Sequence, residues 1–169
     1  MCQRRWSTIS GGDWLRVRRA ENLRMILHRA KERLEARGVE ARISPSLTVA
    51  LPLFRGGADE SRDQLQDLWA RLLAAAMDPS KTDYVRVRSF EALEKLDPPD
   101  ARVLACLPSQ GGGINHGQQN EMAGELGLSR DEVDVSVGNL LRVELASDPH
   151  GAFVTLTALG REFLRAVQD

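Results

Sequence analysis

The spacing of apolar residues between positions 59 and 77 constrains the fold of this chain more than any other feature. Apolar side chains recur there at three- and four-residue steps, the period of one helix face, while polar residues such as Gln66 fill the other side. Asp78-Pro79 would end the helix, because a residue before proline avoids helical backbone. We therefore expect a helix that begins at Asp59 or Glu60 and ends at Met77. Its core-facing residues include Leu65, Leu68, Trp69, Leu72 and Leu73.

A second long helix is predicted from Trp14 to Arg37, with Gly38 as its C-cap. Its apolar face consists of Leu23, Ile26, Leu27, Ala30 and Leu34. When the helix is projected at about 100° per residue, Arg16 and Arg19 fall in the same sector as that face. On the opposite, solvent-facing side lie Arg18, Arg24 and Arg29. The first turns therefore either overhang the core, with long side-chain stems lying along it, or contact an anion.

Charge is sorted along the chain. The 169 residues include 23 Lys plus Arg and 24 Asp plus Glu, for a net charge of -1. Residues 1–42 carry 11 basic and 5 acidic side chains (net +6), and the remaining residues carry 12 and 19 (net -7). Either the basic segment neutralises the acidic body within the fold, or it meets an anionic partner. The candidates for anion or partner binding are Arg16, Arg18, Arg19 and Arg24.

The middle of the chain contains two shorter apolar segments. Leu47–Phe54 carries Pro52 and is followed by Gly56-Gly57, so we expect a short, interrupted or kinked helix there. A further helix is expected over Asp83–Lys95. Its inward-facing residues are Phe90, Leu93 and Leu96.

Asp97-Pro98-Pro99 combines a capping acceptor with proline in a first helical turn, so it predicts the start of a helix that continues over Ala101–Leu107. Residues 108–119 are polar and rich in glycine, and we expect a mobile loop in which His116 is solvated. This loop lacks the Gly-Lys-Ser or Gly-Lys-Thr sequence of a phosphate-binding loop.

The C-terminal segment has a recognisable order of elements. We expect, in turn, a helix over Asn120–Leu126, a helix over Ser129–Arg142, strands over Val143–Ala146 and Ala152–Leu156, and a helix from Thr157. Ser129 and Glu132 have the spacing of a capping box. Together with the helix before them, these elements follow the order of a winged helix-turn-helix.

The predicted fold class is mainly α: an N-terminal helical bundle followed by a winged-helix-like C-terminal part with one small β-hairpin. The expected divisions are a basic flexible arm over 1–13, the bundle over 14–96, and the winged-helix-like region over 97–169. No apolar run has the roughly 18 residues that a membrane span needs, so integral membrane insertion is not expected. With two cysteines and no export signal, we expect a cytoplasmic protein.

The charge of the winged-helix-like region argues against DNA reading by its second helix. From His116 to Asp148 there are two basic and seven acidic side chains, a net charge of -5. DNA-binding surfaces neutralise phosphates, and this balance would repel them. We therefore interpret the region as a structural or protein-contacting module.

The sequence contains no recognisable catalytic constellation. Its histidines, His28, His116 and His150, lie beside no suspected nucleophile, and no motif has metal-ligand spacing. Cys106 lies between Leu104 and Leu107, which is typical of a small core residue. We predict no catalytic residue, no metal and no cofactor.

Several segments resemble a known family. Leu51-Pro52-Leu53 is followed by Glu60 and by the run from Leu65 to Pro79, with its Leu-Trp-Ala-x-Leu-Leu-Ala core; Phe90–Leu96 and Leu156-Thr157-Ala158-Leu159-Gly160 come next. This succession resembles the Abi-alpha family of bacterial abortive-infection proteins over roughly residues 20–167. The resemblance implies a role in bacterial defence against phage, and it carries over no catalytic residue.

The leading hypothesis is a non-enzymatic interaction protein that binds a protein partner or copies of itself. One alternative is a nucleic-acid-binding protein that contacts phosphates through the basic N-terminal helix, or, as a variant, binds anionic lipid at a membrane surface. Another is an enzyme whose site forms only in an oligomer, suggested by the surplus of carboxylates and by His116.

Overall fold

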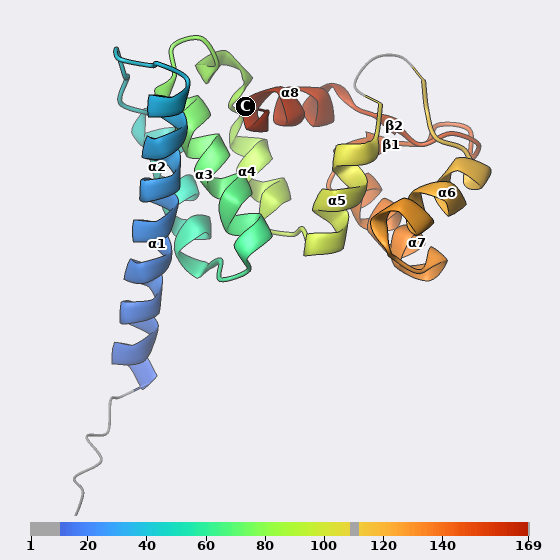
Figure 1. The fold of residues 1–169 in the computed structure, drawn as a ribbon, viewed down its shortest axis with the longest axis horizontal. Coiled ribbons are helices and arrows are strands. Elements are labelled where there is room, and N and C mark those ends of the chain that lie inside the picture. Colours follow the sequence, from blue (N-terminus) through green and yellow to red (C-terminus); the bar gives the residue numbers. More distant parts are fainter. Residues whose placement is uncertain (1–10, 109–111, 169) are drawn as a thin grey trace, which may run out of the picture.

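The structure is a computed structural model that describes residues 11–108 and 112–168. The described part is mainly helical, with one small hairpin, as predicted (Figure 1). Its elements are α1 (Gly11–Ala36), α2 (Leu47–Asp59), α3 (Asp63–Met77), the 3-10 helix η1 (Thr82–Tyr84), α4 (Val87–Leu93), α5 (Pro98–Cys106), α6 (His116–Leu126), α7 (Arg130–Arg142), β1 (Ala146–Ser147), β2 (Thr155–Leu156) and α8 (Ala158–Val167). Residues 1–10 of the predicted arm lie outside the described residues, and its residues 11–13 begin α1.

Helix α1 packs against α3 and α2 along one side of the bundle (Figure 1). It buries Ile26, Ala30 and Leu34, as the spacing predicted. The prediction for Leu27 is wrong, because this side chain is 47% exposed. The inward face is instead rotated toward Asn22, whose buried amide donates a hydrogen bond to the carbonyl of Ala58. Gly38 ends the helix with a φ of +67°, a left-handed conformation that glycine adopts without strain.

Helix α2 is longer than predicted, because it does not end at Gly56-Gly57. It contains Pro52 and both glycines and continues to Asp59. A Cβ on Gly56 would lie 2.4 Å from Cη2 of Trp69, and one on Gly57 would lie 3.0 Å from Cδ1 of Ile26. The two glycines therefore allow close packing of the core instead of ending the helix.

Helix α3 is the centre of the bundle. The predicted core residues Leu65, Trp69, Leu72 and Leu73 are buried, and Leu68 is partly buried against the same core. The Trp69 ring stacks on Phe90 of α4, with 6.1 Å between ring centroids. The helix begins at Asp63, later than predicted, because Glu60 and Arg62 have extended backbone.

The single helix predicted over Asp83–Lys95 is divided into η1 and α4, because Val85 and Arg86 are extended between them. Its three predicted inward residues, Phe90, Leu93 and Leu96, are nevertheless buried. In η1, the Tyr84 ring lies 5.7 Å from the guanidinium of Arg165 on α8. The break thus brings this part of the chain against α8.

Capping residues set the starts of the helices in the second half of the chain. Asp97 and Asp100 form a capping box at α5, and Ser129 and Glu132 form the one predicted at α7. Helix α6 begins at His116, four residues before its predicted start, because Asn115 caps it. The loop expected over 108–119 is therefore shorter, and its residues 109–111 lie outside the described part of the chain.

A short antiparallel hairpin follows α7, with Ala146 opposite Leu156 and Ser147 opposite Thr155. Ile114, which precedes α6, adds an antiparallel bridge to Val154. The first strand is shorter than predicted because Val143 is the C-cap of α7 and Glu144 has a left-handed φ of +61°.

Helix α8 returns the chain to the bundle, where it packs against α3, α4 and η1 (Figure 1). Phe163 is fully buried, and Val167 is also buried. The guanidinium of Arg71 on α3 donates to the carbonyl oxygen of Val167 at 2.9 Å. One continuous core therefore extends from α1 to α8.

Candidate interaction surface on helix α1

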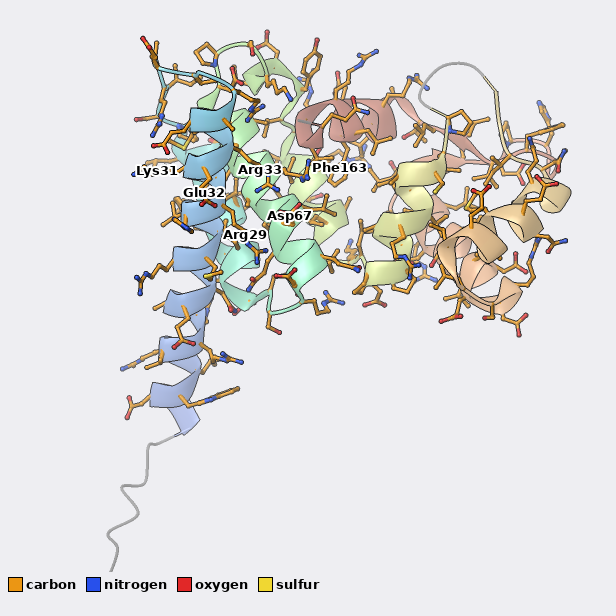
Figure 2. All side chains as sticks on the ribbon, viewed as in Figure 1. Arg29, Lys31, Glu32, Arg33, Asp67 and Phe163 are labelled. Carbon is orange, nitrogen blue, oxygen red and sulfur yellow. The ribbon has the colours of Figure 1, made fainter. Side chains whose placement is uncertain are left out.

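Ion pairs attach the inner side of α1 to the acidic residues of the bundle. They are Arg19–Asp59 at 2.9 Å, Arg29–Asp63 at 2.5 Å, Arg33–Asp67 at 2.5 Å and Arg37–Asp78 at 3.5 Å. Figure 2 shows Arg29 and Arg33 pointing from α1 toward α3 and Lys31 pointing away. The expectation that Arg29 faces solvent is thus wrong. Part of the basic surplus is neutralised within the fold.

Asp67 is the acceptor of this group that two arginines share. It lies between Arg33 and Arg71, with 2.7 Å between its Oδ2 and Nε of Arg71. Burial raises the pKa of the Asp67 carboxyl, but the hydrogen bond from Arg71 and the charge of Arg33 outweigh burial, and the pKa is lowered. Asp67 is therefore ionised at neutral pH and has a structural role.

The four arginines predicted to bind an anion or a partner do not share one face. Arg19 is engaged with Asp59. Arg16 is 86% exposed and lies 4.0 Å from Asp13, whereas Arg18 lies 3.3 Å from Glu21. Arg24 has no ion pair with any described residue. Three of these arginines therefore remain on the outer surface of α1.

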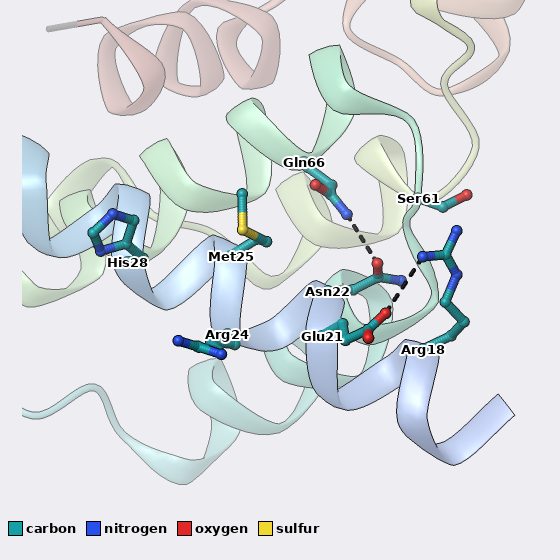
Figure 3. A pocket seen from close by; sticks show the side chains of 8 residues that line it. All are labelled: Arg18, Glu21, Asn22, Arg24, Met25, His28, Ser61 and Gln66. Atoms are coloured by element: carbon teal, nitrogen blue, oxygen red, sulfur yellow. Dashed lines mark hydrogen bonds and ion pairs between the residues drawn. The ribbon is translucent and has the colours of Figure 1, made fainter. Parts of the chain in front are cut away.

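Arg18 and Arg24 line an open pocket of about 810 Å³ beside α1 (Figure 3). The other lining residues are Glu21, Asn22, Met25, His28, Ser61 and Gln66. The two arginines were predicted as binding residues, but the pocket could not be predicted, because Ser61 and Gln66 come from the segment before α3 and from its start.

Two buried amides form the floor of this pocket. The Gln66 amide donates to Oδ1 of Asn22 at 3.1 Å and to the carbonyl of Glu60 at 2.8 Å. Asn22 in turn donates to the carbonyl of Ala58 at 2.8 Å. Gln66 was expected on the solvent-facing side of α3, and its burial is possible because these bonds satisfy its amide hydrogens. The network fixes the position of α1 relative to α2 and α3.

The first turns of α1 project beyond the bundle (Figure 1). They expose three apolar side chains: Trp14 at 58%, Leu15 at 49% and Val17 at 56%. Arg16 and Arg18 alternate with these residues. We refer to residues 14–18 as the α1 tip. Its apolar and cationic side chains are suited to contact another surface, because such a combination is uncommon on a helix that faces only water.

A smaller groove of about 240 Å³ lies between α5 and α7. It is lined by Asp97, Pro99, Asp100, Asp131, Glu132, Val135 and Ser136, and we refer to these residues as the α5–α7 groove. Its rim is acidic, and Val135 is 72% exposed. This groove was not predicted as a unit, because it combines two helices that are separated in the sequence.

The described residues include no group of three or more His, Cys, Asp or Glu side chains that could hold a metal ion. His28 is exposed and lies 3.4 Å from Glu32. Cys106 is exposed at the end of α5, which corrects its predicted core position, and neighbouring protein atoms together with Glu125 raise the pKa of its thiol. A raised pKa disfavours the reactive thiolate.

A family model for abortive infection alpha matches residues 19–167. The chain belongs to the abortive infection alpha family. This finding confirms the resemblance drawn from the sequence, and membership suggests a role in phage defence. No curated protein and no solved structure matched the chain.

The two surfaces of this abortive infection alpha protein differ in whether they lie within the residues that the family model matches. The α5–α7 groove lies inside the matched residues, whereas the α1 tip precedes them. Arg19 and Arg24 are within the match, and Arg16 and Arg18 are not. Among the described helices, none combines the length and apolar character that crossing a bilayer requires.

Proposed function

We propose that this abortive infection alpha protein is a non-enzymatic component of phage defence that acts by binding a protein partner or further copies of itself. The observation that carries the proposal is the α1 tip. Trp14, Leu15 and Val17 remain about half exposed, although the same helix buries Ile26, Ala30 and Leu34 further along the chain. Exposed apolar clusters with a charged border are typical of protein interfaces.

The proposal is tested by measuring molar mass in solution and by affinity capture from infected and uninfected cells. We expect either self-association or a captured protein that is lost from the Trp14→Ala variant. A wild-type protein that stays monomeric and captures no partner in either state would refute the proposal.

We further propose that residues 97–169 have a winged-helix arrangement used for protein contact. The bridge between Ile114 and Val154 supports this arrangement, because it places a short extended segment between α5 and α6 and beside the hairpin. The outer side of α7 exposes Asp131, Asp134 and Val135. Because phosphate contacts need cations, this face is better suited to a protein than to DNA.

Nucleic-acid binding through α1 is the second candidate. It is favoured by the open pocket lined by Arg18, Arg24 and His28, where Arg24 has no ion pair within the described part of the chain. If it is correct, affinity for nucleic acid falls steeply with salt and is lost when Arg18 and Arg24 are changed to Glu. Charge reversal at exposed Lys31, on a later turn of α1, is the matched control. Absence of binding at low salt would exclude this candidate.

A further inference from the structure

The α1 tip and the α5–α7 groove complement each other chemically, yet they cannot meet within one molecule. The tip projects at one end of the protein, α5–α7 lie at the other, and the bundle of α2–α4 lies between them (Figure 1). A contact between the two surfaces therefore requires a second copy of the chain.

The groove is lined by apolar and acidic side chains. Pro99 and the exposed Val135 supply the apolar surface. Three of the carboxylates are engaged: Asp97 pairs with Arg62 at 2.5 Å, and Asp100 and Glu132 accept backbone hydrogen bonds at helix starts. Asp131 has no hydrogen-bond or ion-pair partner among the described residues. The groove thus carries an uncompensated carboxylate beside an exposed valine.

The α1 tip carries positive charge, whereas the groove carries negative charge. Within the described part of the chain, its arginines form only short-range pairs on the exposed helix surface, Arg16 with Asp13 and Arg18 with Glu21. Such pairs contribute little stability, so the guanidinium groups can exchange them for a partner carboxylate at small cost. Trp14 is the largest exposed apolar side chain of the tip. Tryptophan and arginine are the residue types that most often anchor protein interfaces.

We propose that the α1 tip of one copy docks in the α5–α7 groove of a second copy. Trp14 packs over Val135, and Arg18, which lies one turn along the same side of α1, faces Asp131, in the manner of an amphipathic helix bound in a groove. This inference rests on the proposed function and specifies its partner. Because the two surfaces differ, the interface is heterologous, so successive copies join head to tail into an open chain or a ring.

The test begins with the molar mass of the full chain, measured by sedimentation over a range of concentrations at low and high salt. We expect the wild-type mass to rise with concentration and to fall at high salt. Trp14→Ala and Val135→Lys each weaken association by roughly tenfold or more. The control Leu51→Lys adds the same positive charge as Val135→Lys, at an exposed position of α2, and leaves the association unchanged. All three positions are exposed, and circular dichroism verifies that each variant folds.

A mixing experiment distinguishes this interface from any other mode of self-association. Trp14→Ala retains an intact groove, and Val135→Lys retains an intact tip. Their mixture therefore forms a one-to-one heterodimer that does not grow further, at concentrations where each variant alone is monomeric. If Val135→Lys alone associates like the wild type, or if the mixture stays monomeric while the wild type associates, the proposed interface is wrong.

The same measurements separate this inference from the proposed function. A wild-type protein that is monomeric at every concentration overturns head-to-tail docking, whereas a partner captured through the α1 tip would still support the proposed function. A wild-type protein that is both monomeric and partnerless overturns both.

Discussion

At the scale of single residues, the clearest constraint is the glycine pair inside α2. A Cβ added to Gly56 would lie 2.4 Å from Cη2 and 2.6 Å from Cζ2 of Trp69, whose ring is held by Phe90. We predict that Gly56→Ala lowers the free energy of unfolding by about 1–3 kcal/mol, the usual cost of overpacking a core. Gly124→Ala in α6 is the control, because its Cβ meets open space and stability should rise slightly. Urea denaturation measures both, and equal effects would contradict the packing role of Gly56.

Ser89 is a second informative residue, because its hydroxyl is fully buried and has no hydrogen-bond partner among the described residues. We predict that Ser89→Ala leaves stability unchanged or increases it by up to about 2 kcal/mol, since removal of an unsatisfied buried group removes its desolvation cost. The matched change Ser129→Ala removes the cap of α7 and should cost about 1 kcal/mol. Thermal unfolding measures the stability of both variants. A destabilised Ser89→Ala variant would show that the hydroxyl has a partner in solution.

At the scale of elements, the ion pairs between arginines of α1 and aspartates of α3 predict that the free energy of unfolding depends on pH. The pKa of Asp67 is lowered in the folded state, so its contribution is complete above the ordinary pKa of 3.8 and is lost as the pH falls through the lowered value. Asp67→Asn should therefore cost about 1–2 kcal/mol at neutral pH and nothing in strong acid. Asp63→Asn should cost much less, because the Asp63 side chain is 82% exposed. Urea denaturation across the acid range tests this sign, and a loss that is independent of pH would contradict it.

The first turns of helix α1 should also be less stable than the rest of the helix. Asn22, Ile26 and Ala30 pack on the bundle, whereas residues 14–18 do not. We predict that the amides of residues 14–18 exchange hydrogen rapidly in the dilute protein, while those near Ile26 and Ala30 approach the protection of the core. Hydrogen-exchange mass spectrometry measures this difference. Uniform protection along α1 in the dilute protein would mean that the tip is covered within one molecule.

The helices themselves could be predicted from local signals, but their orientations could not. Periodicity identified α3 and most of α1, and the capping sequence at Ser129 identified α7. The edge of the buried face of α1 could not be predicted, because burial of Asn22 depends on hydrogen bonds to Ala58 and Gln66, which are distant in the sequence. The two glycines of α2 are typical of a helix end, and only the fold shows that they lie against Trp69. The α5–α7 groove could not be predicted for the same reason, because its two helices meet only in the fold.

At the scale of the whole molecule, the return of α8 to the bundle links the two halves of the chain. Phe163 is fully buried where α8 packs on α3, and Arg71 is bonded to the end of α8. We predict that the protein unfolds in one cooperative transition, although the sequence suggests separate regions over 14–96 and 97–169. Phe163→Ala should lower stability by about 3–5 kcal/mol and increase hydrogen exchange in α3 as well as in α5 and α7. Phe153→Ala is the matched control, because that ring is about half exposed on the hairpin, and it should have little effect. Two separate transitions, or a Phe163→Ala effect confined to residues 97–168, would show that the bundle and the C-terminal region are energetically independent.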